Sequence, residues 1–267
     1  MYQTMLRILS ISLLRYFILA GIPFLVYYIW RREKMGRAKI QERSAGSKDF
    51  WREIFHSLQT TAVFTALAMI IWFSPLKKYT LVYDHVNDHP LWWIPAFVVL
   101  SLIIHDTYFY WMHRLLHHKK LFRHVHLLHH RSVNPSPFTS YSFHFLEAWA
   151  EGGVLLLLVF ILPMHQLTVL LFTVASLFIN VYGHLGYEIA PRWLRHTFLF
   201  EILNTSTHHN LHHSKFEGNY GLYFRIWDRL MGTENPGYVK DYDRMQEQRF
   251  NKLKVETPTA ALSPVGG

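Results

Sequence analysis

The chain contains no cysteine among its 267 residues. Disulfides, iron–sulfur clusters, thiolate-ligated haem and thiolate zinc sites are therefore excluded, and a reducing compartment is permitted. Charged residues are also scarce, at 17%, whereas hydrophobic residues make up 51%. The net charge is +9, and the basic residues cluster beside apolar and aromatic stretches. This pattern favours a membrane surface over a nucleic acid as the partner of the basic residues.

Long apolar stretches occur at 6–30, 54–73, 91–112 and 152–183. A membrane span needs about 20 apolar residues. The first stretch lacks a small-residue cleavage site, so we interpret it as an anchor helix rather than a removable signal. Pro163 breaks the fourth stretch, which predicts either a helical hairpin that dips into the membrane and returns or a pair of spans. We expect an all-α, multi-pass bundle of about four spans, or three plus a hairpin, with a cytosolic helical cap.

Basic residues are distributed unevenly between the loops. The loop 74–90 has only Lys77 and Lys78. The loop 31–53 has eight basic residues: Arg31, Arg32, Lys34, Arg37, Lys39, Arg43, Lys48 and Arg52. Because cytosolic loops carry the excess of Lys and Arg, the loop 31–53 is predicted to be cytosolic. The third stretch then ends in the cytosol, and both ends of the fourth emerge there. The membrane is either a bacterial inner membrane or the endoplasmic reticulum.

Three segments follow from this organisation. We expect an N-terminal transmembrane region at 1–90, a catalytic domain at 91–238 and a polar, disordered tail at 239–267. The tail turns polar from about residue 240 and ends in a stretch rich in threonine, proline and glycine, which is typical of disorder.

Histidines are grouped in three short stretches with related spacing. The patterns are HxxxH, HxxHH and HxxHH, formed by His113 and His117, by His126, His129 and His130, and by His209, His212 and His213. Residues three and four apart share one face of a helix, so each stretch is predicted to aim two or three imidazoles at one point. Clustered histidines at ligand spacing indicate a metal site.

The type and number of ligand atoms limit which metals the site can bind. Imidazole suits zinc, copper, iron and nickel, and eight histidines are twice what one tetrahedral zinc uses, which favours two metals. Carboxylate-bridged di-iron bundles use paired Glu-x-x-His motifs. The chain has one such motif, from Glu53 to His56, and we interpret it as chance. A membrane metal carrier would distribute histidines along the spans, and a haem protein would need fewer of them. Both remain alternatives.

The three histidine stretches resemble those of the membrane fatty acid hydroxylase and sterol desaturase superfamily. Supporting stretches are 135–140, 183–188, 219–221 and 227–233, and the resemblance covers about residues 90–235. It implies a membrane-bound non-haem di-iron oxidoreductase that uses dioxygen and external electrons to hydroxylate or desaturate a lipid. The implied substrate is a sterol, a fatty acyl chain, an ether lipid or a similar molecule.

The resemblance also implies roles for individual residues. The implied metal ligands are His113, His117, His126, His129, His130, His184, His209, His212 and His213. Beside these motifs, His144, Glu147, Glu188 and His208 are expected to be supporting residues. His105 and Asp106 are predicted to be supporting residues because they are ionisable and lie inside the third apolar stretch. Asp106 is expected to orient one of the ligand histidines through a hydrogen bond. Glu188 is expected to ligate or support the metal, or else to pair with Arg192 at the interface. His208 is expected to be supporting or exposed.

The implied partners are a membrane lipid and a separate electron donor, because no flavin, nicotinamide or fused haem-binding motif is visible. The donor is expected to be a b-type cytochrome or a ferredoxin with its reductase, and no nucleic acid is expected. A basic rim of Lys119, Lys120, Arg123 and Arg131 is predicted either to dock an acidic carrier or to bind anionic headgroups.

Overall fold

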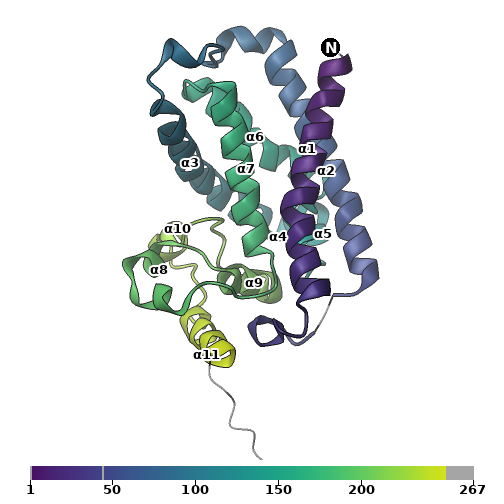
Figure 1. Cartoon of the computed structure of the whole chain (residues 1–267), viewed down its shortest axis with the longest axis vertical. Helices are drawn as coiled ribbons and strands as arrows, with labels where there is room; N and C mark the ends of the chain where they lie inside the picture. Colours follow the sequence, from purple (N-terminus) through teal and green to yellow (C-terminus); the bar gives the residue numbers. More distant parts are fainter. Residues whose placement is uncertain (1, 44, 251–267) are drawn as a thin grey trace, which may run out of the picture.

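The computed structural model describes residues 2–43 and 45–250. Its long helices are α1 (Tyr2–Phe24, continued to Trp30 by a π-helix), α2 (Ser47–Phe73), α3 (Trp93–Leu116), α6 (Phe145–Ile161) and α7 (Gln166–Gly183). These helices stand upright beside one another, and short helices gather at one end (Figure 1). The predicted all-α bundle is confirmed.

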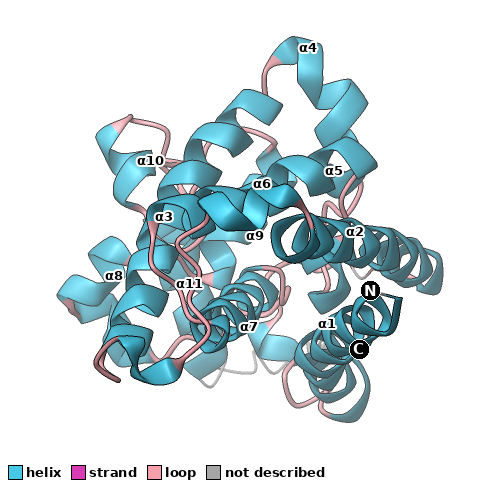
Figure 2. Ribbon diagram, turned by 90° about the horizontal axis from the view of Figure 1, so that it is seen from above, coloured by secondary structure: helices cyan, strands magenta, loops and turns pink. Residues whose placement is uncertain are grey.

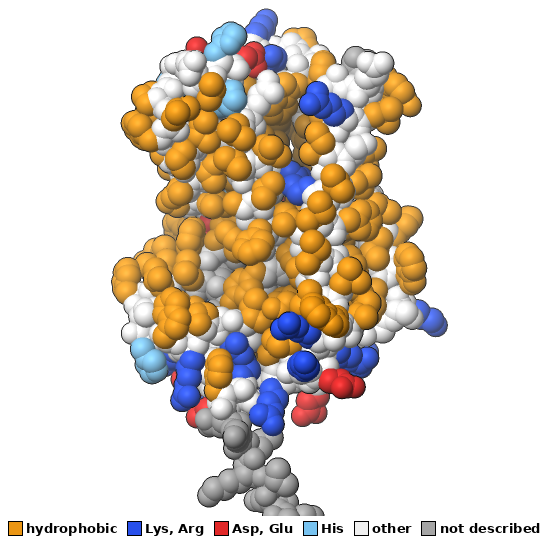
Figure 3. All heavy atoms as spheres, in the orientation of Figure 1, with side chains coloured by type: hydrophobic (Ala, Val, Ile, Leu, Met, Phe, Trp, Pro, Cys, Tyr) orange, Lys and Arg blue, Asp and Glu red, His pale blue; other side chains and the backbone are white. Residues whose placement is uncertain are grey.

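Among the residues that the structure describes, four helices are long and apolar enough to cross a membrane: Tyr2–Trp30, Ser47–Phe73, Trp93–Leu116 and Gln166–Gly183. They correspond to the four predicted apolar stretches. On the face shown in Figure 3, hydrophobic side chains cover a broad band over the long helices, and most of the Lys and Arg side chains lie near the end that carries the short helices. An outward apolar surface of this kind suits contact with lipid tails rather than water.

The fourth apolar stretch forms a hairpin. Helix α6 rises from Phe145 and ends at Ile161, residues 162–165 turn the chain, and α7 descends to Gly183. The hairpin begins just after Ser142 and is followed by His184, so both of its ends lie beside the histidine stretches. Helix α6 packs against α2, and α7 packs against α3, which places the hairpin inside the bundle (Figure 2).

The short helices form a cap at one end of the bundle. They are α4 (Lys119–Leu121), α5 (Leu127–His130), α8 (Phe198–Ile202), α9 (Ser206–Lys215), α10 (Ile226–Leu230) and α11 (Tyr238–Phe250). A π-helix, Phe122–His126, joins α4 to α5. The basic loop before α2 reaches the same end, because Gln41 donates a hydrogen bond to the Asn210 side chain of α9 at 2.8 Å.

Helix α11 corrects the prediction of a disordered tail from residue 239. Residues 239–250 are helical, and Tyr238, Tyr242 and Met245 are buried. The two tyrosines pack with Phe200 and Leu211, so the apolar side of an otherwise polar helix anchors it under α9. The segment is polar on average, so its composition did not reveal the few apolar residues that lie on one face of the helix. The rest of the predicted tail, 251–267, lies outside the described residues.

Candidate metal centre

Nine histidines form two adjacent groups at the junction of bundle and cap. One group contains His113, His117, His126, His130 and His212, and the other contains His129, His184, His209 and His213. Within each group, one ring nitrogen from every histidine lies within 4.8 Å of all the others. These are the nine histidines predicted to bind metal. Each group could therefore hold a metal ion.

Helical spacing divides each HxxHH stretch between the two groups. His126 and His130 are four residues apart and share the first group, whereas His129 belongs to the second. Consecutive helical residues are rotated by about 100°, so adjacent histidines face different directions. In the third stretch, His209 and His213 share the second group, whereas His212 belongs to the first. The expectation that each stretch converges on one point was therefore too simple, because each adjacent pair of histidines serves both groups.

Backbone carbonyls orient four of the rings. In each, Nδ1 lies within hydrogen-bond distance of a carbonyl oxygen: His113 with Tyr220 at 2.9 Å, His129 with Ser142 at 3.3 Å, His184 with Asn180 at 2.8 Å, and His212 with Gly218 at 2.7 Å. A carbonyl only accepts, so Nδ1 carries the proton and Nε2 carries a lone pair. A partner on the far ring nitrogen is the usual way in which proteins orient a metal-binding histidine.

The lone pairs face one another. His129 Nε2 and His184 Nε2 are 3.3 Å apart, and both rings already carry their proton on Nδ1. His113 Nε2 lies 3.0 Å from His126 Nε2, and the Nδ1 of His126 lies 2.6 Å from a Glu147 carboxyl oxygen. No proton remains to join His129 and His184 by a hydrogen bond, so their lone pairs repel unless a cation lies between them. The donor set therefore fits bound metal.

Burial keeps these imidazoles in the neutral form that metals require. It lowers the pKa of His184 and of His212 to about 4, since a charged ring loses its hydration, while each ring's carbonyl partner opposes the shift. For His209 and His213, burial and then the neighbouring rings lower the pKa well below its ordinary value. Protons therefore compete weakly for these nitrogens at neutral pH.

Asp106 corrects one expectation. Its carboxylate accepts hydrogen bonds from the backbone N–H groups of residues 222, 223 and 224 at 3.1, 2.6 and 3.2 Å. It therefore anchors the loop after α9. The prediction that Asp106 hydrogen-bonds directly to a ligand histidine is wrong. That loop includes Tyr220, whose carbonyl faces His113. His105 lies one residue before Asp106, and its Nδ1 is 2.9 Å from the hydroxyl of Tyr223.

Glu188 anchors the helix that carries the third histidine stretch. It is fully buried and accepts hydrogen bonds from the backbone N–H and the hydroxyl of Thr207 at 3.0 and 2.7 Å. The N–H of Ala190, at 2.9 Å, is another donor. A carboxylate at the first turn of α9 satisfies a free N–H and complements the helix dipole. The alternative of an interfacial pair with Arg192 is wrong, and Glu188 belongs to neither histidine group.

His208 and His144 lie outside both groups. His208 is buried against the ring of Tyr238, with the ring centroids 4.9 Å apart, so the expectation of exposure is wrong. His144 precedes α6, where its Nδ1 accepts a hydrogen bond from the Leu146 backbone at 3.3 Å. It caps this helix instead of contacting a predicted ligand. Of the predicted supporting residues, Glu147 makes direct contact with a histidine of the groups.

Glu53 is a supporting residue that its spacing to His56 does not predict. It is fully buried on α2 and accepts hydrogen bonds from the hydroxyls of Ser132 and Ser136 at 2.6 and 2.5 Å. These bonds hold the segment that follows the second histidine stretch against the bundle. It lies in neither histidine group, so its pairing with His56 is not a metal motif here. A carboxylate beside an apolar span was the signal available in the sequence.

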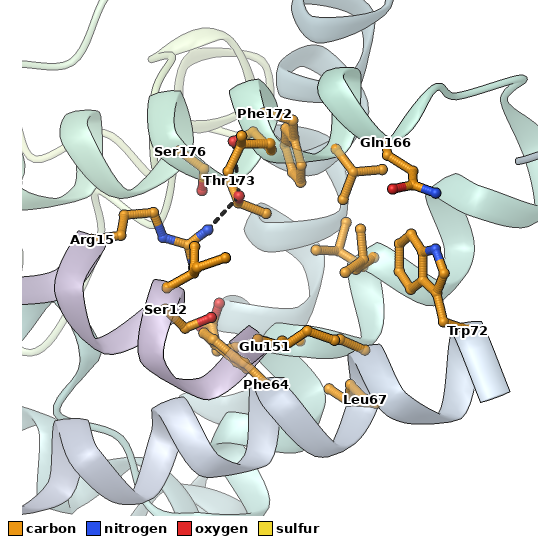
Figure 4. Close-up of a pocket in the computed structure, with 18 of the residues that line it drawn as sticks. Ser12, Arg15, Phe64, Leu67, Trp72, Glu151, Gln166, Phe172, Thr173 and Ser176 are labelled. Carbon is orange, nitrogen blue, oxygen red and sulfur yellow. Dashed lines mark hydrogen bonds between the residues drawn. The ribbon is translucent and has the colours of Figure 1, made fainter. Parts of the chain in front are cut away.

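An apolar cavity of about 700 Å³ approaches the second histidine group from within the bundle. Helices α1, α2, α6 and α7 supply most of its wall (Figure 4). At one end it is lined by Phe143, whose ring centroid is 5.2 Å from that of His129, and by Asn180, whose carbonyl faces His184. Its size and lining suit the hydrocarbon part of a lipid.

A second hollow, of about 1030 Å³, opens on the cap side. It reaches His117 of the first histidine group and is lined by the basic side chains of Lys119, Lys120, Arg123 and Lys215. The two histidine groups are thus approached from two directions, through an apolar cavity and through a basic hollow.

Comparison with known proteins relates this arrangement to one family. Residues 97–233 match the family model described as fatty acid hydroxylase. The chain is 31% identical to a lathosterol oxidase of Rattus norvegicus, over 76% of this chain and 69% of that protein. It is 29% identical to a Delta(7)-sterol 5(6)-desaturase of Gibberella zeae, over 96% of this chain and 70% of that protein. No solved structure gave a significant match.

Proposed function

Because the chain belongs to the fatty acid hydroxylase family, we propose that this integral membrane oxidoreductase of lipids holds two iron ions and hydroxylates or desaturates a hydrocarbon with dioxygen. The observation that carries the proposal is the pair of adjacent all-imidazole groups at the end of a lipid-sized cavity. Relatives named for sterols support a membrane lipid as the substrate.

The nine histidines are the proposed ligands, five for one ion and four for the other. These residues would hold the ions, which would supply the dioxygen-dependent oxidation of an unactivated C–H bond, chemistry that no side chain performs alone. The protein supplies geometry, since backbone carbonyls and Glu147 fix the direction of the rings. Burial excludes water and keeps the rings neutral.

The substrate is proposed to enter from the bilayer. The cavity lies between membrane-spanning helices, and its lining includes Phe64, Leu67, Val169 and Phe172. These side chains bury a hydrocarbon without leaving a polar group unpaired. We propose that a C–H bond of the lipid lies at the end of the cavity near Phe143, because this ring contacts His129 of the second histidine group.

Electrons are proposed to arrive on the cytosolic side. The basic loop before α2 lies at the cap end, and the positive-inside rule supports a cytosolic position for the histidine groups. The basic hollow beside His117 offers a dock for an acidic carrier, a b-type cytochrome or a ferredoxin with its reductase. Replacing Lys119 and Lys120 by Glu is expected to slow reduction by the native donor. Unchanged reduction kinetics would remove the docking site from the proposal.

Metal analysis combined with lipid profiling tests the proposal. We expect about two iron ions per chain and a lipid product that is absent from cells lacking the protein. His129→Ala and His212→Ala remove one histidine from each group and are expected to abolish product and lower the iron content. His196→Ala is the matched control, because this exposed histidine lies outside both groups. Full activity of either group variant would contradict the assignment.

A further inference from the structure

The apolar cavity contains two ionisable side chains within its membrane-embedded wall. Arg15 of α1 donates a hydrogen bond from Nη1 to the Thr173 hydroxyl of α7 at 2.5 Å, and its Nε is buried without a partner. Glu151 of α6 is 8% exposed and lines the same cavity. Among residues 2–43 and 45–250, it makes no hydrogen bond or ion pair. Ionisable groups at this depth are costly and mark functional sites by default.

The two side chains do not neutralise each other. No ion pair joins Arg15 to Glu151 among the described residues, although both line one cavity. Figure 4 shows them gathered with Ser12, Thr173 and Ser176 in one part of the cavity, away from Trp72 and Gln166. The wall thus offers a strong donor and an acceptor with capacity to spare. A ligand that both accepts a hydrogen bond from Arg15 and donates one to Glu151 would offset the free-energy cost of burying these two groups in an apolar cavity.

A hydroxyl group is such a complement, because it accepts one hydrogen bond and donates another. We propose that Arg15 and Glu151 bind the hydroxyl group of a lipid alcohol whose hydrocarbon extends along the cavity to the histidine groups. This names a substrate class and rests on the proposed function. A lipid carboxylate fits less well, since it accepts from Arg15 but has no proton to donate to Glu151. A plain hydrocarbon leaves Glu151 and the Nε of Arg15 without a hydrogen-bond partner.

Two separations show how far this subsite lies from the histidine groups. Glu151 is four residues from Glu147 on α6, and the Glu147 carboxyl is 2.6 Å from His126 Nδ1. Thr173, which holds Arg15, and His184 are 11 residues apart in the sequence. At a rise of about 1.5 Å per residue, these separations are roughly 6 Å along α6 and 16 Å along α7. Several C–C bonds therefore separate the hydroxyl from the carbon that reaches the histidine groups.

Binding of a matched ligand series tests the subsite. Hexadecan-1-ol, hexadecane and hexadecanoate differ only at one end, and their affinities are measured for the full-length protein in nanodiscs. A hydrogen bond to a charged group contributes enough for a tenfold difference in affinity or more. We therefore expect the alcohol to bind at least tenfold more tightly than the alkane, and more tightly than the carboxylate.

Variants assign that preference to the two side chains. Arg15→Leu and Glu151→Leu are each expected to reduce the alcohol-to-alkane ratio towards one, and Glu151→Gln to retain part of it. Arg7→Leu is the matched control, because Arg7 lines the same cavity two turns earlier on α1 and is exposed. A preference that survives both leucine variants would overturn the assignment to this pair.

The unaltered protein decides the matter even if a variant fails to fold. Equal affinity for the alcohol and the alkane would overturn the subsite, and so would tighter binding of the carboxylate. Binding is read without turnover, so an alcohol-selective protein that forms no product would refute the proposed function and leave the subsite standing. Product formation without alcohol selectivity would refute the subsite and leave the proposed function standing.

Discussion

Replacing Glu188 by Gln tests whether this buried carboxylate holds α9 in place. In Glu188→Gln one carboxylate oxygen becomes an amide NH₂, which cannot accept a hydrogen bond. In one orientation of the amide, the N–H and hydroxyl of Thr207 lose an acceptor that lies at 3.0 and 2.7 Å. In the other, the N–H of Ala190 and the hydroxyl of Tyr182 lose one at 2.9 and 3.3 Å.

The expected loss of stability follows from these contacts. Two hydrogen bonds to a charged group contribute roughly 3–6 kcal/mol together. For a chain of this size, a loss of 3 kcal/mol lowers the unfolding midpoint by about 6 °C or more. The metal content should fall as well, since α9 carries three of the proposed ligands. The assays are thermal unfolding of the detergent-solubilised protein and metal analysis of the same sample.

Glu201→Gln is the matched control. Glu201 pairs with Arg229 at 2.7 Å, but the two side chains are 41% and 47% exposed. Ion pairs at exposed positions contribute about 1 kcal/mol at most. Equal unfolding midpoints and equal metal contents for the two variants would show that the buried contacts of Glu188 do not hold the site.

Three further predictions concern the site and its support. Glu147→Ala removes the carboxylate 2.6 Å from His126 Nδ1 and should weaken metal affinity about 10- to 100-fold, as measured by competition with a chelator; unchanged affinity would mean that this contact does not orient the ring. Asp106→Ala leaves three backbone N–H groups without an acceptor and should cost at least about 3 kcal/mol of unfolding free energy in denaturant titration; a smaller loss would show that water replaces the carboxylate. The pKa values of His184 and His212, lowered by burial to about 4, make the unfolded chain bind protons before the folded one does. The metal-free protein should therefore lose stability as the pH falls from about 6.5 towards 4, and a constant unfolding midpoint over that range would contradict it.

Local periodicity accounts for what could be predicted. Apolar runs near 20 residues are long enough to span a membrane, so the four spans followed from the sequence. Histidines three and four apart share a helix face, so the identity of all nine members of the two groups could be inferred from spacing and resemblance. The helical tail segment 239–250 was missed, because its burial depends on partners such as Phe200 that lie far away in the chain.

Contacts between distant residues account for the rest. The roles of Asp106, Glu53 and Glu188 depend on loops that are distant in sequence or turn back on themselves, and no spacing rule predicts such pairs. The same holds for Arg15 and Glu151, which meet in a cavity only when α1 and the α6–α7 hairpin pack together.

The sequence by itself determined which donors are present, on which helix faces they lie and which segments are apolar enough for a membrane, because these properties depend on residues only a few positions apart. Only the tertiary structure decided how adjacent histidines are divided between two groups, which carboxylates hold the surrounding loops and where the lipid-sized cavity runs. Those arrangements arise when five long helices and the cap pack together, which brings side chains from separate elements into contact.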